Sequence, residues 1–520
     1  YFKIVSFFNI SLTNKNIMFL VMTDYLNKNR NQIAVILAIS LTYFYRVNQF
    51  IFPQNYQQDD ISELRVIFFE NFSCALDRGD NHPLFTIFIW FLSKFFEYPE
   101  YILSSLIIIL TISSIYILFN IFGDQFSIGI AIIFLGVLFF SQPIITYSLS
   151  LKQYALELYA SAYSFRFFQK YLNTNEYKNS ISKYCFVSVI LILFSFVNAI
   201  PFFLTIFFIF LNEKRINFNL IIFPFLAMLP FTRFIISKLQ RVSGNGYWDD
   251  FFITNEVVSF QDFYENFYFL NSLFLKSLFV ENLVPLVFPI YLLSVVIAFF
   301  QKDKLTNYSL LGVASIVLLS IIGFYPLGGG RTDILFIPYL LFLISSFANF
   351  LYLKFFNKKG QYLLAVIFAL YITNGVVTTE VFYKDENVEP IIENIREKYN
   401  NEDTLIIVTE DQFPSIIYYS MELVDSVSFE IGDCTKTVPN ISNILQFKNN
   451  SYFNNLGENK GDTSDVIQEK NQIILIGIEL PGTNGKYRAA NDLILKNGFI
   501  IDSQTKYENG LVSIKFIRDE

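Results

Sequence analysis

The sequence predicts a multi-pass α-helical membrane protein of about eleven transmembrane helices, followed by a soluble C-terminal α/β domain. Hydrophobic residues make up 53% of the 520 residues and charged residues only 16%, a composition that soluble domains rarely have. Apolar runs recur along the first three quarters of the chain, as expected for helices that cross a hydrocarbon core about 30 Å thick. The last quarter is instead acidic and alternates short apolar strands with polar segments.

A break in charge near residue 383 separates the two predicted parts. Residues 384–520 carry 23 acidic and 13 basic residues, a balance of −10, whereas the residues before them carry 22 acidic and 25 basic, a balance of +3. We therefore expect a cytoplasmic tail at 1–29, a transmembrane domain at 30–383 and a soluble extracytoplasmic domain at 384–520. Because Met22 opens a typical cytoplasmic tail, we expect residues 1–21 to precede the native start.

Eleven apolar runs are the predicted spans. Two of them are short and are interrupted at residues 198–201, Asn-Ala-Ile-Pro, which indicates a hairpin or a broken helix. The runs lie at 33–51, 101–120, 126–143, 154–170, 184–197, 201–211, 219–237, 279–300, 307–324, 332–353 and 361–381.

One further apolar segment, residues 84–96, is predicted to lie along the membrane surface in the first outer loop. As a helix it is only about 20 Å long, short of the hydrocarbon thickness. If it does not cross, every basic connector falls on the cytoplasmic side, as the positive-inside rule requires. These connectors carry Lys28, Arg30, Lys170, Lys178, Lys183, Lys214, Arg215, Lys302, Lys304, Lys354, Lys358 and Lys359. The same topology places the first loop, the loop 238–278 and the C-terminal domain outside.

In the C-terminal region, alternating and apolar patterns predict strands at 404–409 and 473–478 and a closing hairpin of 498–504 with 511–517. Helical patterns are expected at 387–399 and from Pro414. The Asn-, Lys- and Gly-rich stretch 447–463 is expected to be loop.

Residue usage excludes several kinds of site. The three cysteines (Cys74, Cys185 and Cys434) are too scattered for a disulfide framework or a metal cluster, and a single histidine argues against a histidine-based zinc site. No glycine-rich phosphate loop is present, and the 63 phenylalanines fit an AT-rich genome better than base stacking. We expect no nucleic-acid partner and no cofactor, with a divalent cation left open.

Polar residues of the first outer loop are candidates for chemistry, because polar groups beside a membrane usually line a site or a water-filled cavity. Asp59 and Asp60 follow the first span, and about twenty residues later His82 stands before Pro83. One carboxylate could take a proton from an attacking hydroxyl, although acidic pairs are usually solvated loop residues. His82 could donate a hydrogen bond to a phosphate, or simply precede a helix whose first residue is proline.

A second set of polar residues lies at the outer ends of later spans. Lys152, Tyr154 and Glu157 open the span 154–170, and Arg331 follows three glycines before the span 332–353. Arginine suits two-pronged phosphate recognition. The competing explanations are a lysine that extends to the interface and a plain turn with an interfacial arginine.

These segments resemble motifs of the C-type (GT-C) membrane glycosyltransferases, in the family 39-like branch that includes the dolichyl-phosphate-mannose–protein mannosyltransferases. Asp59-Asp60 resembles the family's Asp-Glu pair, and residues 81–84, Asn-His-Pro-Leu, resemble its His-Pro-Pro-Leu. Residues 147–156 resemble Tyr-Ser-x-x-x-Arg-x-Tyr-x-Leu, with Lys152 for the arginine and Tyr154 at the second tyrosine. The segment 330–338 resembles an Arg-x-x-x-Pro stretch. Ser150 stands where the family often has an acid, and Glu157 is the candidate replacement.

The resemblance implies a GT-C-like fold over residues 30–380 and an inverting glycosyltransferase in the cell membrane, with Asp59 as base and Asp60 in support. It implies a polyprenyl-phosphate sugar as donor and a glycan, lipid or protein as acceptor. Topology favours the same donor, because nucleotide sugars are cytoplasmic and the candidate residues face outward. The alternatives are a transporter or flippase of a lipid-linked saccharide, and a non-catalytic cell-envelope protein whose C-terminal domain binds a partner.

Overall fold

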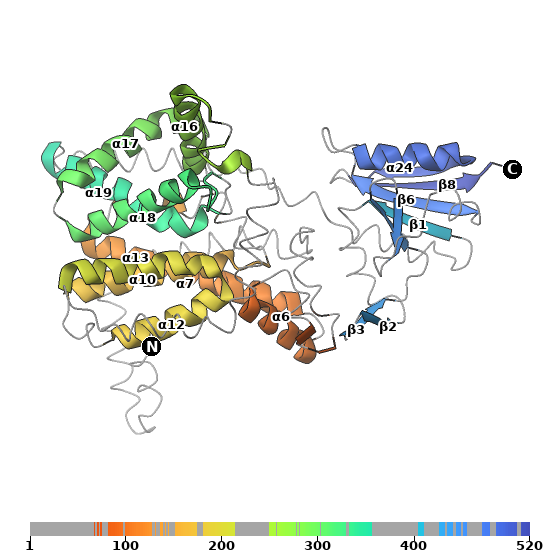
Figure 1. Ribbon diagram of the computed structural model, residues 1–520, viewed down its shortest axis with the longest axis horizontal. Helices are drawn as coiled ribbons and strands as arrows, with labels where there is room; N and C mark the ends of the chain where they lie inside the picture. Colours follow the sequence, from red (N-terminus) through yellow and green to blue (C-terminus); the bar gives the residue numbers. More distant parts are fainter. Residues whose placement is uncertain are drawn as a thin grey trace, which may run out of the picture. The chain divides into compact units, whose positions relative to one another are not determined.

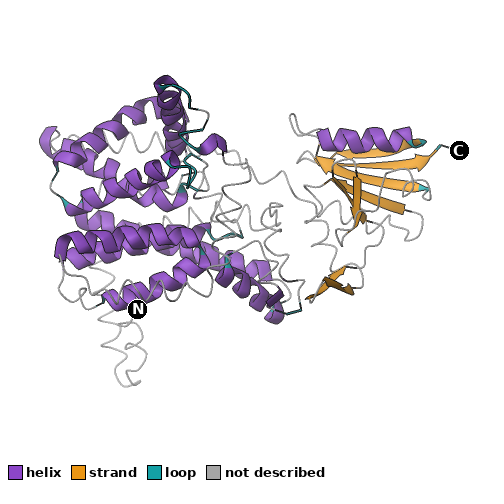
Figure 2. Cartoon of the chain, viewed as in Figure 1, coloured by secondary structure: helices purple, strands orange, loops and turns teal. Residues whose placement is uncertain are grey.

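The computed structural model describes helical segments in the first part of the chain and a sheet in the last part (Figures 1 and 2). The chain divides by compactness into Tyr1–Phe52 and Pro53–Glu520, and the described residues all belong to the second unit. They are 82–96, 99–126, 151–173, 180–213, 249–355 except 256, 277, 280, 302 and 329–331, then 404–409, 426–431, 434–439, 444–448, 451–454, 471–478, 485–506, 511–519 and scattered residues in 67–74 and 130–144. The predicted boundary near residue 383 lies outside them.

The helical part follows the predicted apolar runs closely. Its α-helices are α6 (Pro83–Phe95), α7 (Pro99–Gln125), α10 (Tyr154–Asn173), α12 (Ile181–Phe194), α13 (Ala199–Glu213), α16 (Phe260–Lys276), α17 (Val284–Phe300), α18 (Lys304–Ile321) and α19 (Ile337–Phe355). Short 3-10 turns accompany them: η2 (Phe196–Asn198), η4 (Asp249–Phe251), η5 (Glu281–Leu283) and η6 (Ile334–Phe336).

Three helical stretches of the described residues are long and apolar enough to cross a membrane: Ile102–Gln125, Lys304–Ile321 and Ile334–Leu351. Four shorter apolar helices accompany them, at Pro83–Phe95, Ile181–Phe194, Phe196–Leu211 and Val284–Phe300. The predicted spans 33–51, 219–237 and 361–381, and most of 126–143, lie outside the described residues. The membrane character expected from the sequence is therefore supported, and the number of eleven spans stays a prediction.

Helix α10 is the most polar of the predicted spans that the structure describes, and other helices pack around it. It is not among the long apolar helices, yet twelve of its twenty residues are buried, Glu157 and Gln169 among them. It packs against α7, α12, α13, α19 and η6. A helix surrounded by other helices has little contact with lipid, so it can carry polar residues that a lipid-facing helix cannot.

Helix directions follow from paired contacts between the helices. At one end of α10 the Glu157 carboxylate contacts Ser195, and further along the Ser164 hydroxyl contacts Tyr184, so α10 and α12 run antiparallel. At the other end Arg166 forms an ion pair with Asp124 of α7 at 2.5 Å, so the C-terminal ends of α7 and α10 lie together. Both relations agree with the alternation of crossings predicted for these segments.

The chain between α12 and α13 is a hairpin, one of the two forms expected there. Helix α13 runs back along α12, since the Phe202 ring of α13 stacks on the Tyr184 ring of α12 with centroids 5.9 Å apart. At the turn the backbone of Ser195 is extended, and η2 follows. The Asn198 side chain donates to the Leu191 carbonyl oxygen at 2.8 Å, so it satisfies an acceptor that the end of α12 leaves open. The turn begins three residues earlier than predicted, because Pro201 fits inside the first turn of α13.

The C-terminal region contains a six-stranded sheet in the order β5-β4-β1-β6-β8-β7 and a separate β2-β3 hairpin. The strands are β1 (Thr404–Thr409), β2 (Ser426–Ile431), β3 (Cys434–Pro439), β4 (Ile444–Lys448), β5 (Ser451–Asn454), β6 (Gln472–Ile478), β7 (Phe499–Lys506) and β8 (Leu511–Arg518). Strands β1, β4 and β6 are parallel, and β6-β8-β7 is antiparallel. The predicted strands 404–409 and 473–478 and the closing hairpin are confirmed.

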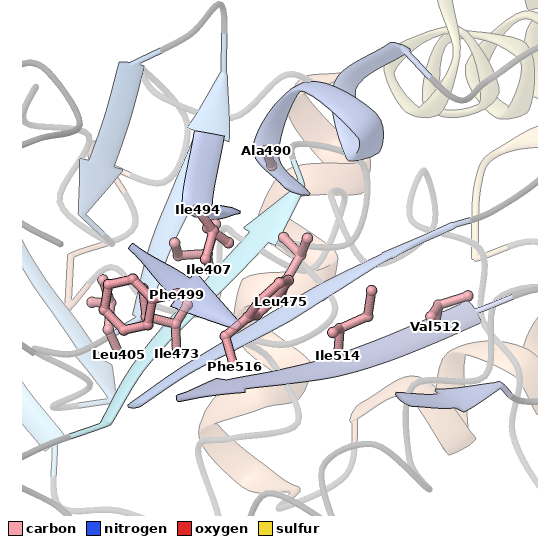
Figure 3. Close-up of a cluster of buried hydrophobic side chains, with 10 residues drawn as sticks. All are labelled: Leu405, Ile407, Ile473, Leu475, Ala490, Ile494, Phe499, Val512, Ile514 and Phe516. Atoms are coloured by element: carbon pink, nitrogen blue, oxygen red, sulfur yellow. The ribbon is translucent and has the colours of Figure 1, made fainter. Parts of the chain in front are cut away.

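Helix α24 (Gly485–Lys496) covers one face of this sheet (Figure 1). Ile494 and Ala490 of the helix pack on Leu475, Ile407 and Phe499 of the strands (Figure 3). Gly498, with φ of +82°, ends the helix and leads directly into β7, a backbone conformation that glycine adopts without strain.

The prediction that 447–463 is loop is wrong at its start. Residues 444–448 and 451–454 pair as the antiparallel strands β4 and β5. Lys448 pairs with Ser451, so only two residues of the sequence, Asn-Asn, connect the strands, and so short a connection favours a hairpin more strongly than the polar composition favours loop. Helix α24 was not predicted either, and the helical patterns expected at 387–399 and from Pro414 lie outside the described residues.

Candidate functional site

His82 stands at the N-terminus of α6, and its side chain points away from that helix. Its carbonyl oxygen accepts the Thr86 N–H at 2.9 Å, so the residue occupies the N-cap position before Pro83. The side chain makes no capping hydrogen bond. Instead the Phe196 backbone N–H donates to His82 Nδ1 at 3.3 Å, and the Phe196 ring packs edge-on against the imidazole with centroids 4.8 Å apart.

This hydrogen bond determines which nitrogen of the His82 ring can donate. A neutral imidazole has one N–H and one acceptor nitrogen. Because Nδ1 accepts from Phe196, the proton of the neutral ring lies on Nε2. The site therefore presents an N–H donor on a side chain that is only 9% exposed.

Glu157 lies in the first turn of α10 and is only 2% exposed. The Ser195 hydroxyl, which is fully buried, donates to its Oε1 atom at 2.7 Å. A hydrogen bond from a neutral donor to a carboxylate is stronger than one between neutral groups. The bond therefore ties the N-terminal end of α10 to the turn between α12 and α13.

Two residues predicted from the sequence are thus held by consecutive residues of the chain. Ser195 holds Glu157, and the next residue, Phe196, holds His82. His82 and Glu157 are 75 positions apart in the sequence, and neither is near Ser195 in the chain. We call these four residues the Ser195 cluster. Ser195 was not among the predicted site residues, and the interruption between two short apolar runs is the sign in the sequence that could have indicated it.

Some buried polar side-chain atoms on the elements that carry or adjoin the Ser195 cluster have no hydrogen-bond partner. Among the described residues they belong to Thr86 on α6, Gln153 just before α10, Asn198 in η2 and Thr332 before η6. Because almost all buried polar groups in proteins are satisfied, these atoms indicate a place that a polar ligand or water would complete.

The remaining predicted residues fall near this end of the helices or outside the described part of the chain. Lys152 and Tyr154 lie immediately before Glu157, in the segment that enters α10, and both are half-buried. Asp59, Asp60 and Arg331 lie outside the described residues. The structure therefore brings His82, Lys152, Tyr154 and Glu157 to one region and leaves the placement of the other three a prediction.

The loop on either side of Arg331 is itself fixed. The Asp333 carboxylate is fully buried and accepts the Gly328 N–H at 3.0 Å, and the Tyr325 hydroxyl donates to the Thr332 carbonyl oxygen at 3.0 Å. Gly328 has φ of +79°, so the turn needs glycine at this position. Through η6 the same loop packs against α10, the helix that carries Glu157.

Among the described residues there is no group of three or more His, Cys, Asp or Glu side chains that could hold a metal ion. The cysteines differ from expectation in one respect. Cys74, in the segment before α6, is disulfide-bonded, whereas Cys185 in α12 is a buried free thiol. The wide spacing of the three cysteines in the sequence gave no indication of this bond, because a disulfide depends on distance in the fold and not on spacing in the chain.

Comparison with known proteins identifies no relative of this chain. No protein-family model matches it, and neither a curated protein nor a solved structure matches it significantly.

Proposed function

We propose that the chain is an inverting membrane glycosyltransferase that moves a sugar from a polyprenyl-phosphate donor to an acceptor hydroxyl on the outer face of the cell membrane. The observation that carries the proposal is the Ser195 cluster, in which consecutive residues, Ser195 and Phe196, hold Glu157 and His82. Both residues belong to segments that resemble motifs of the C-type glycosyltransferases.

In this reaction the acceptor oxygen attacks the anomeric carbon of the donor. The Asp59 carboxylate, supported by Asp60, takes the hydroxyl proton as the new carbon–oxygen bond forms. The bond from the anomeric carbon to the phosphate oxygen breaks, and the electron pair leaves with the polyprenyl phosphate. Attack from the face opposite the leaving group inverts the configuration of the sugar.

The leaving phosphate gains negative charge as its bond to the sugar breaks, and fixed donors aimed at that charge lower the barrier. The His82 Nε2–H is one such donor, since Nδ1 is already engaged by Phe196. Lys152 and Arg331 are the proposed cations. Tyr154 is the further proposed contact for the donor.

Glu157 has a positioning role in this mechanism. Its carboxylate holds the Ser195 hydroxyl, and the next backbone N–H orients the His82 ring. Glu157 need not touch the substrate to affect the reaction. If the backbone at Ser195 and Phe196 shifted, the His82 imidazole would turn away from the donor phosphate.

Two features support an outward orientation. A stable disulfide at Cys74 is typical of an oxidising compartment outside the cytoplasm, and Cys74 lies only a few residues before α6. Helix α6 also stays at the end of α12: His82 contacts Phe196 and Phe88 contacts Phe194. Along α6 the chain thus advances six residues, about 9 Å, while its contacts on the neighbouring segment shift by only two residues. This suits a helix that lies along the surface and does not cross beside α12.

The first test replaces the base. Asp59→Asn or Asp60→Asn should abolish transfer without affecting insertion, because a neutral amide cannot accept the hydroxyl proton. Loss of a general base slows a reaction by about 10²–10⁴-fold, with the larger effect expected at Asp59. Transfer is measured in membranes supplied with radiolabelled lipid-phosphate sugars. Full activity of the double variant would refute the enzyme hypothesis.

The second test concerns the donor. Arg331→Ala and Lys152→Ala should weaken binding of the polyprenyl-phosphate sugar, because each removes a cation from a poorly solvated phosphate site. Arg331→Lys should restore only part of the affinity, since lysine lacks the planar two-pronged geometry. Turnover of nucleotide sugars, with the lipid-linked donors inert, would contradict the proposal.

A flippase of a lipid-linked saccharide is the second candidate, because buried hydroxyls of three helices hydrogen-bond to one another inside the helical part. Thr205 Oγ1 and Tyr308 Oη lie 2.7 Å apart, and the Tyr308 and Tyr339 hydroxyls 3.3 Å apart. These groups hydrogen-bond to one another across α13, α18 and α19. Translocation of a fluorescent lipid-linked sugar in vesicles without glycoside formation would favour this candidate over transfer.

A further inference from the structure

Helix α16 has an exposed aromatic stripe that nothing in the proposed reaction uses. Phe260, Tyr264 and Tyr268 are 85%, 60% and 42% exposed. They follow one another at every fourth position and so lie on one side of the helix. Val258, just before the helix, is 94% exposed and extends this apolar surface.

The start of α16 and its rotation are fixed by hydrogen bonds. The Asp262 carboxylate accepts the Ser259 and Val258 N–H groups at 2.7 and 3.1 Å, and Ser259 Oγ accepts the Asp262 N–H, which is a reciprocal cap. On the side opposite the aromatic stripe, Asn266 donates to the carbonyl oxygens of Ile253 and Asn255. The stripe is therefore held facing away from the residues that anchor the helix.

The C-terminal half of α16 packs on the apolar helix α17. The Tyr268 ring contacts Phe288, and the Tyr291 hydroxyl donates to Asn271 at 3.3 Å. Helix α17 is apolar along its whole length and exposes Leu286, Leu293 and Phe300. The exposed aromatic stripe is thus continuous in the chain with an apolar helix that also exposes large side chains.

Helix α16 also supports the loop that leads to Arg331. A side chain added at Gly328 would lie 2.9 Å from both the Leu270 carbonyl oxygen and Leu273 Cβ, so the loop backbone rests directly on the helix. The Leu327 N–H donates to the Phe251 carbonyl oxygen at 2.9 Å, which ties the same loop to η4. The depth of α16 relative to a membrane therefore sets the depth of this loop.

Charge identifies the kind of surface that α16 fits. Residues 249–276 contain five acidic residues and a single basic one, Lys276 at the last position of α16. Helices that bind anionic membrane surfaces carry lysine and arginine on their polar face, whereas aromatic side chains suit the headgroup region of any bilayer. A neutral lipid surface matches this segment, and an anionic surface does not.

We propose that α16 lies in the headgroup region of the membrane, with Phe260, Tyr264 and Tyr268 inserted beside the upper acyl chains of neutral lipids. This insertion holds the loop 323–328 at the depth of lipid phosphates. The consequence for a polyprenyl-phosphate donor rests on the proposed function, because Arg331 would then meet the donor phosphate at that depth. The insertion itself does not depend on any activity.

The test uses the full chain in nanodiscs and tryptophan fluorescence. The sequence has only two tryptophans, Trp90 and Trp248, and both are replaced by phenylalanine. Phe260→Trp or Tyr264→Trp is then introduced, with Glu265→Trp, one residue along the same turn, as the matched control. Fluorescence is compared in discs of neutral lipid with and without bromine on the acyl chains.

The two stripe variants should lose most of their emission in brominated discs, and the control should keep most of its emission. Equal quenching at all three positions would overturn the proposal. A blue-shifted emission that bromine does not quench would also overturn it, because the stripe would then be covered by protein, for example a second copy of the chain. Adding anionic lipid should not increase the quenching, and an increase would contradict the neutral surface. No transfer is measured, so failure here is distinct from failure of the proposed function.

Discussion

Replacing Ser195 with alanine tests the link between Glu157 and the rest of the Ser195 cluster. The substitution removes one hydroxyl whose hydrogen bond to Glu157 Oε1 is 2.7 Å long and leaves a carboxylate that is 2% exposed without that donor. A hydrogen bond to a charged group contributes about 1.5–3 kcal/mol to stability, against about 0.5–1.5 kcal/mol for a neutral pair. We expect the free energy of unfolding to fall by about 2 kcal/mol.

Ser164→Ala is the matched control for this measurement. Like Ser195, Ser164 is buried and forms a side-chain hydrogen bond between α10 and the segment of α12. Its partner is the Tyr184 hydroxyl at 3.0 Å, and that pair is neutral. Both variants would be unfolded by denaturant in nanodiscs, together with Glu157→Gln and the Glu157→Gln, Ser195→Ala double variant. The double-mutant cycle isolates the coupling between Glu157 and Ser195. A loss at Ser195 no larger than at Ser164, or zero coupling, would refute a charge-assisted bond.

The same variants separate positioning from folding. If Ser195 and Glu157 orient His82 toward the donor phosphate, Ser195→Ala should lower kcat more than it raises KM for the lipid-linked donor, because the His82 donor acts on charge that develops as the bond to the phosphate breaks. Ser164→Ala should leave kcat unchanged. An unchanged kcat for Ser195→Ala, or equal effects of the two variants, would contradict the positioning role.

Three other predictions address topology, the disulfide and the cap of α16. Impermeant labelling from outside should reach engineered thiols at 55–58, 242–247 and beyond 384 but not at 174–180 or 356–360; labelling at 174–180 would mean that the segment 84–96 crosses the membrane. Non-reducing peptide mapping should recover Cys74 in a crosslinked peptide and Cys185 as an alkylated thiol, with Cys434, the one other cysteine of the sequence, as the expected partner; an alkylated Cys74 would contradict the disulfide. Hydrogen bonds from Ser259 and Val258 lower the pKa of Asp262 below its ordinary value, so the cap should stabilise α16 at neutral pH and be lost as pH falls below about 3.9. Hydrogen exchange of the Val258 and Ser259 amides should report that loss, and Asp262→Ala should lack the protection at every pH.

The sequence by itself determined where the apolar helices and the central strands of the described residues lie, because that information is local. Pro83 and the apolar run behind it predict α6, and the apolar segments at 404–409 and 473–478 predict the strands that became the centre of the sheet. Burial of a continuous apolar run requires regular backbone hydrogen bonding, so such runs rarely form anything else. The hairpin of β4 with β5 was missed because its strands are short, and their pairing depends on the neighbouring strand β1.

Tertiary structure alone decided which polar residues act together. His82 and Phe196 are 114 positions apart and Ser195 and Glu157 are 38 apart, so no local pattern connects them. The burial of Glu157 likewise depends on the helices that enclose α10, and the disulfide of Cys74 depends on a partner that the chain brings close. Hydrogen bonds act only over about 3 Å. A polar cluster in a helical membrane protein is therefore a property of how the helices pack, and the sequence supplies only its members.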